Sequence, residues 1–313
     1  MINDDKYTPE EELYIEQLLD GQKGEPKEDD GPSIKSLFDA VISQQKNGRF
    51  VAHHLADYGI RGWEDCTRAK LSGFPKHLTD AGVCKSTAKN YTAILTATLN
   101  RYKEDAPIPC REIGAALKCK GEQAQKVWLN EDELKLFAAA KPKNKRWEFV
   151  QLTFLISAKT GMRLSDALQA TTDNVADGKL TYVSVKTKIE ASVPISGKTY
   201  FMLERLQALK EKVKVPVPAT YEIVCRKLCE QAGIDDQVKV FKAGRTQTGP
   251  KWQFVTSHTA RISFATILAE KDVPTRTIMR LMGHTDERST IGYIASKRVS
   301  LNDEASKFFS DEE

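Results

Sequence analysis

Two histidines, an arginine and a tyrosine lie within 36 residues towards the end of this 313-residue chain. His258 and Arg261 are three residues apart, so they share one face of an expected helix. His284 follows a glycine between two expected helices, and Tyr293 comes nine residues later. A guanidinium can hold phosphate oxygens by paired hydrogen bonds, and a tyrosine hydroxyl can attack phosphorus while its proton is drawn off. These four side chains are half of a site that could transfer a phosphoryl group.

Two basic residues far upstream could supply the other half. Arg163 follows a glycine turn at the start of an expected helix, and a second guanidinium would offset the charge of a five-coordinate transition state. Lys186 lies at the turn of an expected β-hairpin, where its amine could protonate a departing alkoxide. The sequence contains neither a P-loop nor a cluster of carboxylates for two metal ions. It therefore predicts phosphoryl transfer without a metal ion or a cofactor.

The charge is distributed unevenly along the chain. Residues 1–32 carry eleven acidic and three basic side chains, and residues 302–313 carry five and one. Because the net charge of the whole chain is +4, residues 33–301 hold a net charge of +16. A basic body of this kind favours a polyanionic partner such as nucleic acid. We interpret the two acidic ends as tails, the first of them disordered.

The composition, 40% hydrophobic and 29% charged, is typical of a soluble globular protein. Six cysteines are spread without a CxxC pair, which favours reduced thiols over a zinc site. No apolar run approaches the roughly 18 residues of a membrane helix, and the N-terminus has no secretory signal. We therefore expect a cytoplasmic protein that has no membrane partner.

The spacing of apolar residues predicts a mainly α protein with small β-hairpins, in two domains. Residues 33–105 form an all-α domain, and residues 106–126, which contain two prolines, form a linker. We expect helices near residues 34–42, near Phe50–Tyr58, from about Trp63 towards Leu71, and over Thr87–Tyr102 with Ser86 as its cap. Candidate DNA contacts on this domain and the linker are Lys85, Lys89, Arg101, Lys103, Lys118 and Lys120.

Residues 127–301 form the second domain, which is α+β. Asn130 and Glu133 can form a capping box for its first helix, and Gly161 can end the apolar helix Trp147–Thr160. Two strand pairs are expected, residues 181–185 with 191–195 and residues 238–241 with 253–255. Further helices are expected over Thr199–Lys212, Thr220–Ala232, His258–Glu270 and Pro274–Leu281, and in a last helix that holds Tyr293.

Together these segments resemble the tyrosine recombinase, or phage integrase, family. The resemblance rests on Thr160-Gly-Met-Arg163-Leu-Ser-Asp166, Val185-Lys186-Thr with Val193-Pro-Ile downstream, His258-Thr-Ala-Arg261, Leu281-Met-Gly-His284 and Tyr293, in family order and at family spacing. It covers about residues 127–300, and residues 33–105 are similar, with a weaker signal, to the family's core-binding domain. One departure is Ser263, in a box where neighbouring positions often carry another histidine; it affects none of the implied roles.

The resemblance implies how the phosphate is held. Arg163 and Arg261 would clamp the scissile phosphate, and His284 would add a hydrogen bond to the same group. Asp166, at the position of the family's acidic residue, would brace Arg163 without reacting. No ATP and no metal ion would take part.

The resemblance also implies how protons move. Tyr293 would form a 3′-phosphotyrosyl link, with His258 assisting proton transfer at its hydroxyl. Lys186 would protonate the 5′-hydroxyl leaving group. Counting back from Val193 places the family's lysine at Lys186, and Lys188 is the alternative.

As a whole, the resemblance implies a site-specific recombinase or integrase that encloses a double-stranded DNA recombination site with both domains. Strand exchange would run through a Holliday junction in a homotetramer, with accessory DNA-bending or directionality proteins as further partners. Residues 294–313, with Phe308 and Phe309, would pack on a neighbouring protomer or on their own domain. A phage, a mobile genetic element and a cellular genome all stay open as the source, in a bacterial or phage-infected cell.

Two alternative functions stay open. A type IB topoisomerase uses the same chemistry but relaxes supercoils as a monomer, and a DNA-binding regulator could keep the fold without activity. The helical first domain and the short span from Arg163 to Tyr293 favour the recombinase over the topoisomerase. A non-catalytic binder would have no need of Tyr293.

Overall fold

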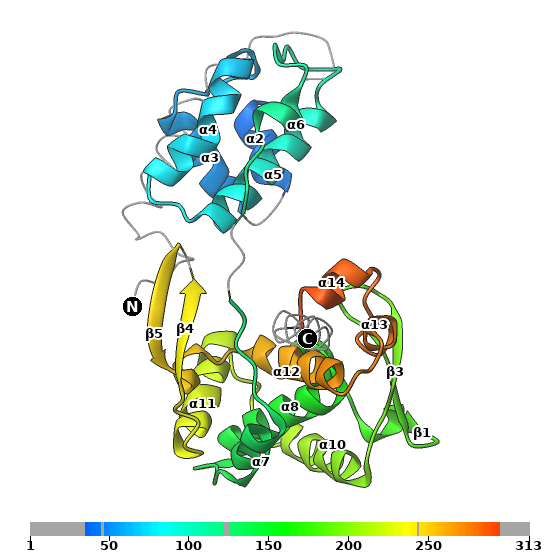
Figure 1. The fold of residues 1–313 in the computed structure, drawn as a ribbon. Coiled ribbons are helices and arrows are strands. Elements are labelled where there is room, and N and C mark those ends of the chain that lie inside the picture. The colour runs from blue at the N-terminus through cyan, green and yellow to red at the C-terminus, as the bar shows by residue number, and fades with distance from the viewer. Residues whose placement is uncertain (1–34, 45–46, 122–124, 243, 295–313) are drawn as a thin grey trace, which may run out of the picture. The chain divides into compact units, whose positions relative to one another are not determined.

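The computed structural model describes residues 35–44, 47–121, 125–242 and 244–294 (Figure 1). The chain divides into two compact units, Met1–Gln123 and Ala124–Glu313. The predicted mainly α architecture with small antiparallel sheets is confirmed. Both predicted acidic tails, and the Phe308–Phe309 pair, lie outside the described residues. Within the described ranges, no helix is both long and apolar enough to cross a membrane. All six cysteines are free thiols.

The described part of the first unit is helical and surrounds one hydrophobic core. Its helices are α2 (Leu37–Gln44), α3 (Gly48–Asp57), α4 (Arg68–Asp80), α5 (Lys85–Arg101) and α6 (Ile113–Ala116), with a 3₁₀ turn at Trp63–Asp65. The longest helix, α5, buries Tyr91, Leu95 and Leu99 at helical spacing and packs against α2, α3, α4 and α6.

Two helix starts differ from the predictions. The third helix, α4, begins at Arg68, because Thr67 caps it by accepting a backbone hydrogen bond (3.3 Å), and the residues before it form the separate 3₁₀ turn. Helix α5 begins at Lys85, so Ser86 lies inside its first turn and Cys84 takes the cap position. Cys84 makes no side-chain cap hydrogen bond, so the start of α5 had no capping residue by which the sequence could show it.

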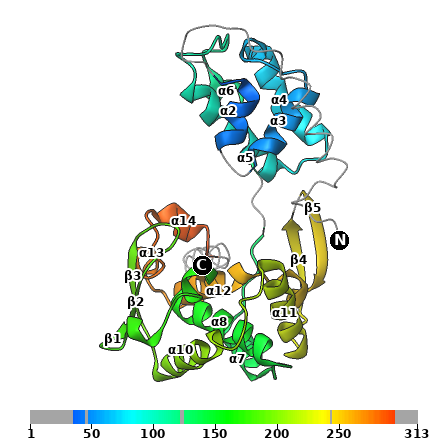
Figure 2. The ribbon, with the colours of Figure 1, turned by 180° about the vertical axis from the view of Figure 1, so that it is seen from behind.

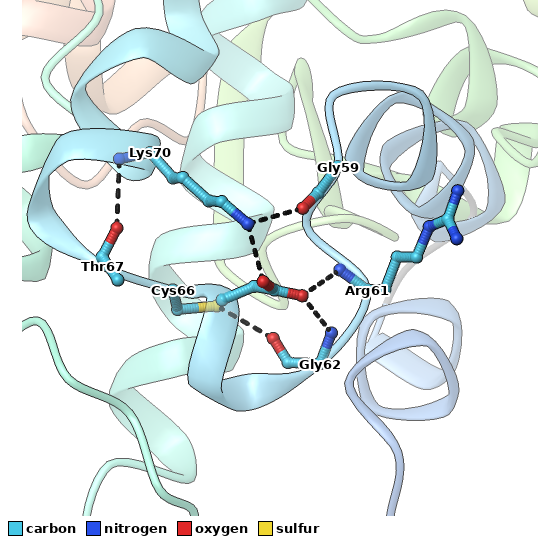
Figure 3. Close-up of polar contacts among 7 residues, drawn as sticks. Gly59, Arg61, Gly62, Cys66, Thr67 and Lys70 are labelled. Carbon is cyan, nitrogen blue, oxygen red and sulfur yellow. Dashed lines mark hydrogen bonds and ion pairs between the residues drawn. The ribbon is translucent and has the colours of Figure 1, made fainter.

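The carboxylate of Asp65 organises the loop between α3 and α4. One oxygen accepts hydrogen bonds from the Arg61 and Gly62 amides (2.9 and 3.1 Å), and the other accepts one from Lys70 Nζ (2.6 Å). Lys70 also donates to the Gly59 carbonyl (2.8 Å), as Figure 3 shows. These hydrogen bonds, that of Lys70 foremost, lower the pKa of Asp65 to about 2. The charged carboxylate thus fixes the loop and leaves the Arg61 side chain exposed.

The predicted linker over residues 106–126 is shorter in the structure. Ile108, Cys110, Ile113 and Leu117 are buried in the core of the first unit, where α6 packs against α4 and α5. The prolines in this stretch interrupt helical periodicity but do not prevent the apolar side chains around them from packing. Residues as far as Leu117 therefore belong to the first unit.

Helix α8 (Lys145–Thr160) is the centre of the second unit. Its neighbours are α7 (Glu131–Ala139), α9 (Leu164–Ala167), α10 (Gly197–Lys210), α11 (Pro218–Gln231) and α12 (Ser257–Glu270), followed by α13 (Thr275–Leu281) and α14 (Glu287–Ile291). Figure 2 shows α8 among α7, α10, α11 and α12. Because it packs against these four helices, most of its residues are buried. One hydrophobic cluster joins α8 to α10 and a β-sheet, and another joins it to α7 and α11.

The predicted helix caps of the second unit are confirmed. Asn130 accepts a hydrogen bond from the Glu133 amide (2.8 Å), and the Glu133 carboxylate accepts one from the Asn130 amide (2.7 Å). Gly161 ends α8 in the left-handed conformation, with φ 69°. A Cβ at Gly161 would lie 2.5 Å from the ring of Phe264, so a larger residue there would push α12 away from α8.

The first sheet has three antiparallel strands in the order β1-β2-β3. They are β1 (Val175–Ala176), β2 (Lys179–Val183) and β3 (Glu190–Pro194). Tyr182 pairs with Ala191 and Leu180 pairs with Val193, and all four residues are buried. The predicted hairpin is therefore confirmed, with β2 beginning two residues earlier than expected.

The second sheet pairs β4 (Gln237–Lys242) with β5 (Arg245–Pro250). The predicted partner strand at residues 253–255 was wrong, because Lys251–Phe254 form a 3₁₀ turn. Most of β5 is exposed and polar, so it lacks the alternation of apolar residues by which a strand is recognised in a sequence.

Candidate active site

A pocket of about 420 Å³ in the second unit brings together the six residues predicted to share a site. Its lining consists of Arg163, Leu164, Ser165, Lys186, Ser257, His258, Arg261, His284, Ser289 and Tyr293. They come from the start of α9, the β2–β3 turn, α12, the loop after α13 and the segment that begins with α14. In the described part of the chain, no group of three or more His, Cys, Asp or Glu side chains is arranged to hold a metal ion.

Arg163 occupies the N-cap position of α9, and its Nη1 donates a hydrogen bond to Ser184 Oγ (3.0 Å). Asp166 is 3% exposed, and one of its carboxylate oxygens accepts a hydrogen bond from the Val185 amide (2.9 Å). Its other oxygen has no partner among the described residues. Asp166 was predicted to brace Arg163, but within the described structure no hydrogen bond joins the two side chains. Both side chains instead hold the end of β2 and the start of the β2–β3 turn.

The β2–β3 turn carries the two candidate lysines. It closes through hydrogen bonds from the Lys188 amide to the Ser184 carbonyl (2.8 Å) and from the Ser184 amide to the Ile189 carbonyl (2.9 Å). Lys188 adopts φ 57°, a conformation that is uncommon for residues other than glycine. Lys186 lines the pocket and Lys188 does not. This difference favours Lys186 as the lysine that reaches a bound phosphate.

Arg261 has the largest of the fully buried side chains in the described structure and is 1% exposed. Its Nη1 donates to the Gly161 carbonyl, and its Nη2 donates to the Met282 carbonyl (2.8 Å). Burial lowers its pKa, and so does the positive charge of Arg163. A buried cation that lines a pocket favours an anion there.

His284 is 8% exposed and bonded on both ring nitrogens. Its Nε2 lies 2.6 Å from Arg261 Nη2, and its Nδ1 lies 2.9 Å from Thr290 Oγ1. Burial, and then the positive charges of Arg261 and Arg163, lower the pKa of His284 to about 4. The imidazole is therefore neutral at neutral pH.

Tyr293 lies two residues beyond α14, so the prediction that it sits inside a helix was wrong. Its amide donates to the Thr290 carbonyl (2.8 Å), which forms a turn directly after α14. The centroid of its ring lies 6.5 Å from the His258 ring, 5.2 Å from the His284 ring and 5.4 Å from the guanidinium carbon of Arg261. Partial burial lowers the pKa of His258, as do the charges of the two arginines. Two neutral imidazoles and a cation thus surround the tyrosine.

Several residues that hold the site carried no recognisable sequence signal. Ser184 and Thr290 anchor Arg163 and His284, but serine and threonine are common in turns. The hydroxyl of Tyr182 is buried and interacts with the Arg261 guanidinium; burial raises its pKa, and the positive charge of Arg261 opposes that effect. Lys126 places its Nζ 4.7 Å from the centroid of the Tyr293 ring, although its position in the sequence suggested only a linker.

The six basic residues predicted to contact DNA are all exposed on the first unit. Lys85 and Lys89 lie at the start of α5, while Arg101 and Lys103 lie at its far end, about 20 Å away at 1.5 Å per residue. Lys118 and Lys120 follow α6, and a Cβ at Gly121 would lie 2.9 Å from Cδ of Lys89. The residues thus form two groups, and contact with phosphate stays a prediction for each.

Comparison with known proteins gives one family and a set of related folds. The model of the phage integrase family matches residues 127–299. No curated protein matches the sequence. A crystal structure of a lambda integrase dimer bound to a COC′ core site has a TM-score of 0.55 at 16% identity, over 92% of this chain and 95% of that chain. A structure of the Tn1549 transposon integrase in complex with a circular intermediate DNA has a TM-score of 0.58 at 15% identity, and the match covers 86% of this chain and 99% of that chain.

A crystal structure of a lambda integrase tetramer bound to a Holliday junction has a TM-score of 0.52 at 17% identity, over 93% of this chain and 78% of that chain. At such identities the likeness concerns the fold. The family match is independent of it and extends over more than half of the chain, including every residue that lines the pocket. The chain therefore belongs to the phage integrase family of tyrosine recombinases.

Proposed function

We propose that this protein is a site-specific DNA recombinase or integrase that cuts and rejoins DNA through a 3′-phosphotyrosyl intermediate. The observation that carries the proposal is the convergence of two arginines, two histidines and a lysine on the pocket that contains Tyr293. Such a set of phosphate-binding groups around a tyrosine is suited to transesterification and has no purpose in a protein that only binds DNA.

The pocket suits a phosphodiester because its arginines are already oriented. Arg261 is held by the Gly161 and Met282 carbonyls, so its positive charge is fixed in the lining of the pocket. Arg163 reaches the same pocket from α9. Donors fixed before the reaction stabilise the charge that develops on the oxygens without reorganising, which is a large part of electrostatic catalysis.

In the cleavage step, Tyr293 Oη forms a bond to phosphorus and the bond from phosphorus to the 5′-oxygen breaks. The phenolic proton leaves towards a base, and the neutral His258 imidazole is the group proposed to receive it. The departing 5′-oxygen takes a proton, which we assign to Lys186. In the rejoining step, a 5′-hydroxyl attacks the same phosphorus and gives its proton to Lys186, while the bond to Tyr293 breaks and the tyrosine oxygen takes back the proton from His258. One ester is exchanged for another each time, so no external energy source is required.

We further propose that strand exchange runs through a Holliday junction in a homotetramer. The lambda integrase tetramer on such a junction, which shares the fold, supports this assembly. Residues 33–105 would act as a core-binding domain and residues 127–301 as the catalytic domain on a double-stranded recombination site. The protein would work in the cytoplasm of a bacterial or phage-infected cell, with accessory DNA-bending or directionality proteins as further partners.

The test begins with a DNA site for the protein. The Tyr293→Phe variant, which should bind DNA without cutting it, is used to select duplexes from a random library. The selected duplex is then nicked near its centre. After cleavage, the short fragment that carries the freed 5′-hydroxyl diffuses away, so the strand cannot be rejoined and the covalent product accumulates. We expect wild-type protein to form an adduct that resists denaturant, with the DNA attached to the peptide that contains Tyr293 by mass spectrometry.

The matched control is the Tyr293→Phe variant on the same nicked duplex, which should bind and form no adduct. An adduct with this variant would contradict the assignment of the nucleophile. Two intact copies of the site on one plasmid should yield recombinant products. Relaxation of supercoils without recombinants and without sequence dependence would favour the topoisomerase, and binding without an adduct in wild type would favour the regulator.

A further inference from the structure

We propose that Lys126 is a positioning residue for the nucleophile, whose ammonium group holds the ring of Tyr293 in the pocket and places positive charge beside it. Its Nζ lies 4.7 Å from the centroid of that ring, within the range of cation–π attraction. A Cβ built at Gly292 would lie 3.7 Å from the same Nζ, so the amine also lies beside the residue that precedes the tyrosine. The nucleophilic role rests on the proposed function, whereas the ring contact does not.

The segment that carries Lys126 is held on both sides. The Gln125 amide donates to the Phe241 carbonyl of β4 (3.3 Å), and the Leu129 amide donates to Ser263 Oγ of α12 (2.8 Å). Ser263 in turn donates to the Thr259 carbonyl (2.8 Å), so the segment is tied to the helix that carries Arg261. An anchored segment can hold a lysine over one ring, which a mobile segment could not.

The ring of Tyr293 is the group that can compensate the Lys126 ammonium for the hydration it has lost. Among the described residues, no carboxylate lies within ion-pair distance of Nζ. The residue is exposed overall, and burial of part of its side chain lowers the pKa of the amine; within the described structure no attractive charge is found to oppose that effect. The ammonium has lost part of its water, and the face of an aromatic ring can replace some of that loss. The charge of Lys126 also contributes to the lowered pKa of His284, so the field of the amine reaches the phosphate-binding groups.

The contact has a consequence for cleavage. As Tyr293 attacks, its hydroxyl loses a proton and the ring gains negative charge, so a cation beside the ring is attracted more strongly in the transition state than before. An interaction that strengthens along the reaction accelerates it, whereas one that is equal in both states does not. Loss of Lys126 should therefore slow adduct formation and leave DNA affinity unchanged.

The first experiment measures the ring contact without DNA. The protein is labelled with 3-fluorotyrosine at all nine tyrosines, and the fluorine signal of Tyr293 is identified by its absence in Tyr293→Phe. We expect Lys126→Met to shift and sharpen this signal, Lys126→Arg to restore it in large part, and Lys198→Met to leave it unchanged. Lys198 is a matched control because it is an exposed lysine of the same unit outside the pocket. An unchanged signal in Lys126→Met would overturn the proposal.

The second experiment measures adduct formation on the selected nicked duplex at saturating protein. We expect Lys126→Met to slow it about tenfold and Lys126→Arg to recover most of the loss, with the dissociation constant for DNA within about twofold of wild type. Weaker binding, with a salt dependence reduced by about one phosphate contact and an unchanged rate, would overturn the proposal and make Lys126 a DNA contact. If wild type forms no adduct, the proposed function fails, while the fluorine signal still decides whether Lys126 holds the ring.

Discussion

Arg261 and His284 are joined by a hydrogen bond of 2.6 Å from the guanidinium Nη2 to the imidazole Nε2. A guanidinium only donates, so Nε2 accepts and the ring proton must lie on Nδ1, which then donates to Thr290 Oγ1 (2.9 Å). In this state neither nitrogen of His284 offers a proton to a phosphate. For His284 to donate to a phosphate, as the family resemblance implies, its Nε2 would have to gain a proton and give up the bond to Arg261. His284 is therefore not oriented in advance as the two arginines are.

The bond between Arg261 and His284 predicts an acid-sensitive second unit. The pKa of His284 is about 4 in the folded protein, below its ordinary value, because burial and the nearby arginines oppose its charged form. A lowered histidine pKa gives stability that is present above the unfolded pKa and is lost as pH falls towards the folded one. We expect the free energy of unfolding to fall by about 2 kcal/mol between about pH 7 and about pH 4.5 from this group.

The measurement is denaturant unfolding of wild type and His284→Gln at several pH values, followed by tryptophan fluorescence. Three of the four tryptophans, at positions 128, 147 and 252, report on the second unit. The glutamine amide can still accept from Arg261 but does not titrate, so the stability of His284→Gln should depend less on pH. Parallel pH curves for the two proteins would show that His284 is not the group responsible.

Lys186 and Lys188 can be distinguished by the leaving group of the DNA. If Lys186 protonates the 5′-oxygen, Lys186→Ala should slow cleavage by roughly 10²- to 10⁴-fold, the usual contribution of a general acid. A duplex with sulfur in place of that bridging oxygen should restore most of the rate, because a thiolate leaves without a proton. Lys188→Ala is the matched control and should be close to wild type on both duplexes. The reverse pattern would assign the proton donor to Lys188.

The same sulfur-containing duplex tests how Asp166 acts. Asp166 bonds the Val185 amide, one residue before Lys186, and does not bond the guanidinium of Arg163 in the described structure. Asp166→Asn should therefore misplace the β2–β3 turn and slow cleavage of ordinary DNA, with partial rescue by sulfur. No rescue would mean that Asp166 acts through Arg163 and the phosphate clamp, as the family resemblance implies.

The pocket could be foreseen from the sequence because its chemistry requires rare residue types in a fixed order. Arg163, His258, Arg261 and Tyr293 have few substitutes for holding and attacking a phosphate, so their spacing is informative. The helix caps at Asn130 and Gly161 were predictable for a similar reason, since few residues satisfy the exposed amides and carbonyls at helix ends.

Other features depended on packing, which the sequence shows poorly. Strand β5 is polar because it is exposed, and Leu117 lies in the first core although prolines precede it. Lys126 is close to Tyr293 only because Gln125 and Leu129 are anchored to β4 and α12, residues more than a hundred positions away. A contact formed over such a separation leaves no local pattern.

The buried ion pair between Glu133 and Lys251 yields a prediction about stability. Lys251 Nζ lies 2.6 and 2.7 Å from the two carboxylate oxygens of Glu133. The side chain of Lys251 is only 13% exposed and that of Glu133 only 10%. Removing one partner leaves the other as an uncompensated buried charge, so Glu133→Gln should lower the free energy of unfolding by about 3 kcal/mol.

The matched control is Asp132→Asn, one residue earlier on α7. Asp132 pairs with Lys135 at 2.7 Å, but both side chains are largely exposed, so solvent screens the pair and its loss should cost much less than the loss of Glu133. The double variant Glu133→Gln with Lys251→Met should recover part of the stability lost by Glu133→Gln alone, because no buried charge is then left unpaired. Denaturant unfolding of the three variants and the wild type measures each change in the free energy of unfolding. Equal losses for Glu133→Gln and Asp132→Asn would mean that burial does not control the strength of these pairs.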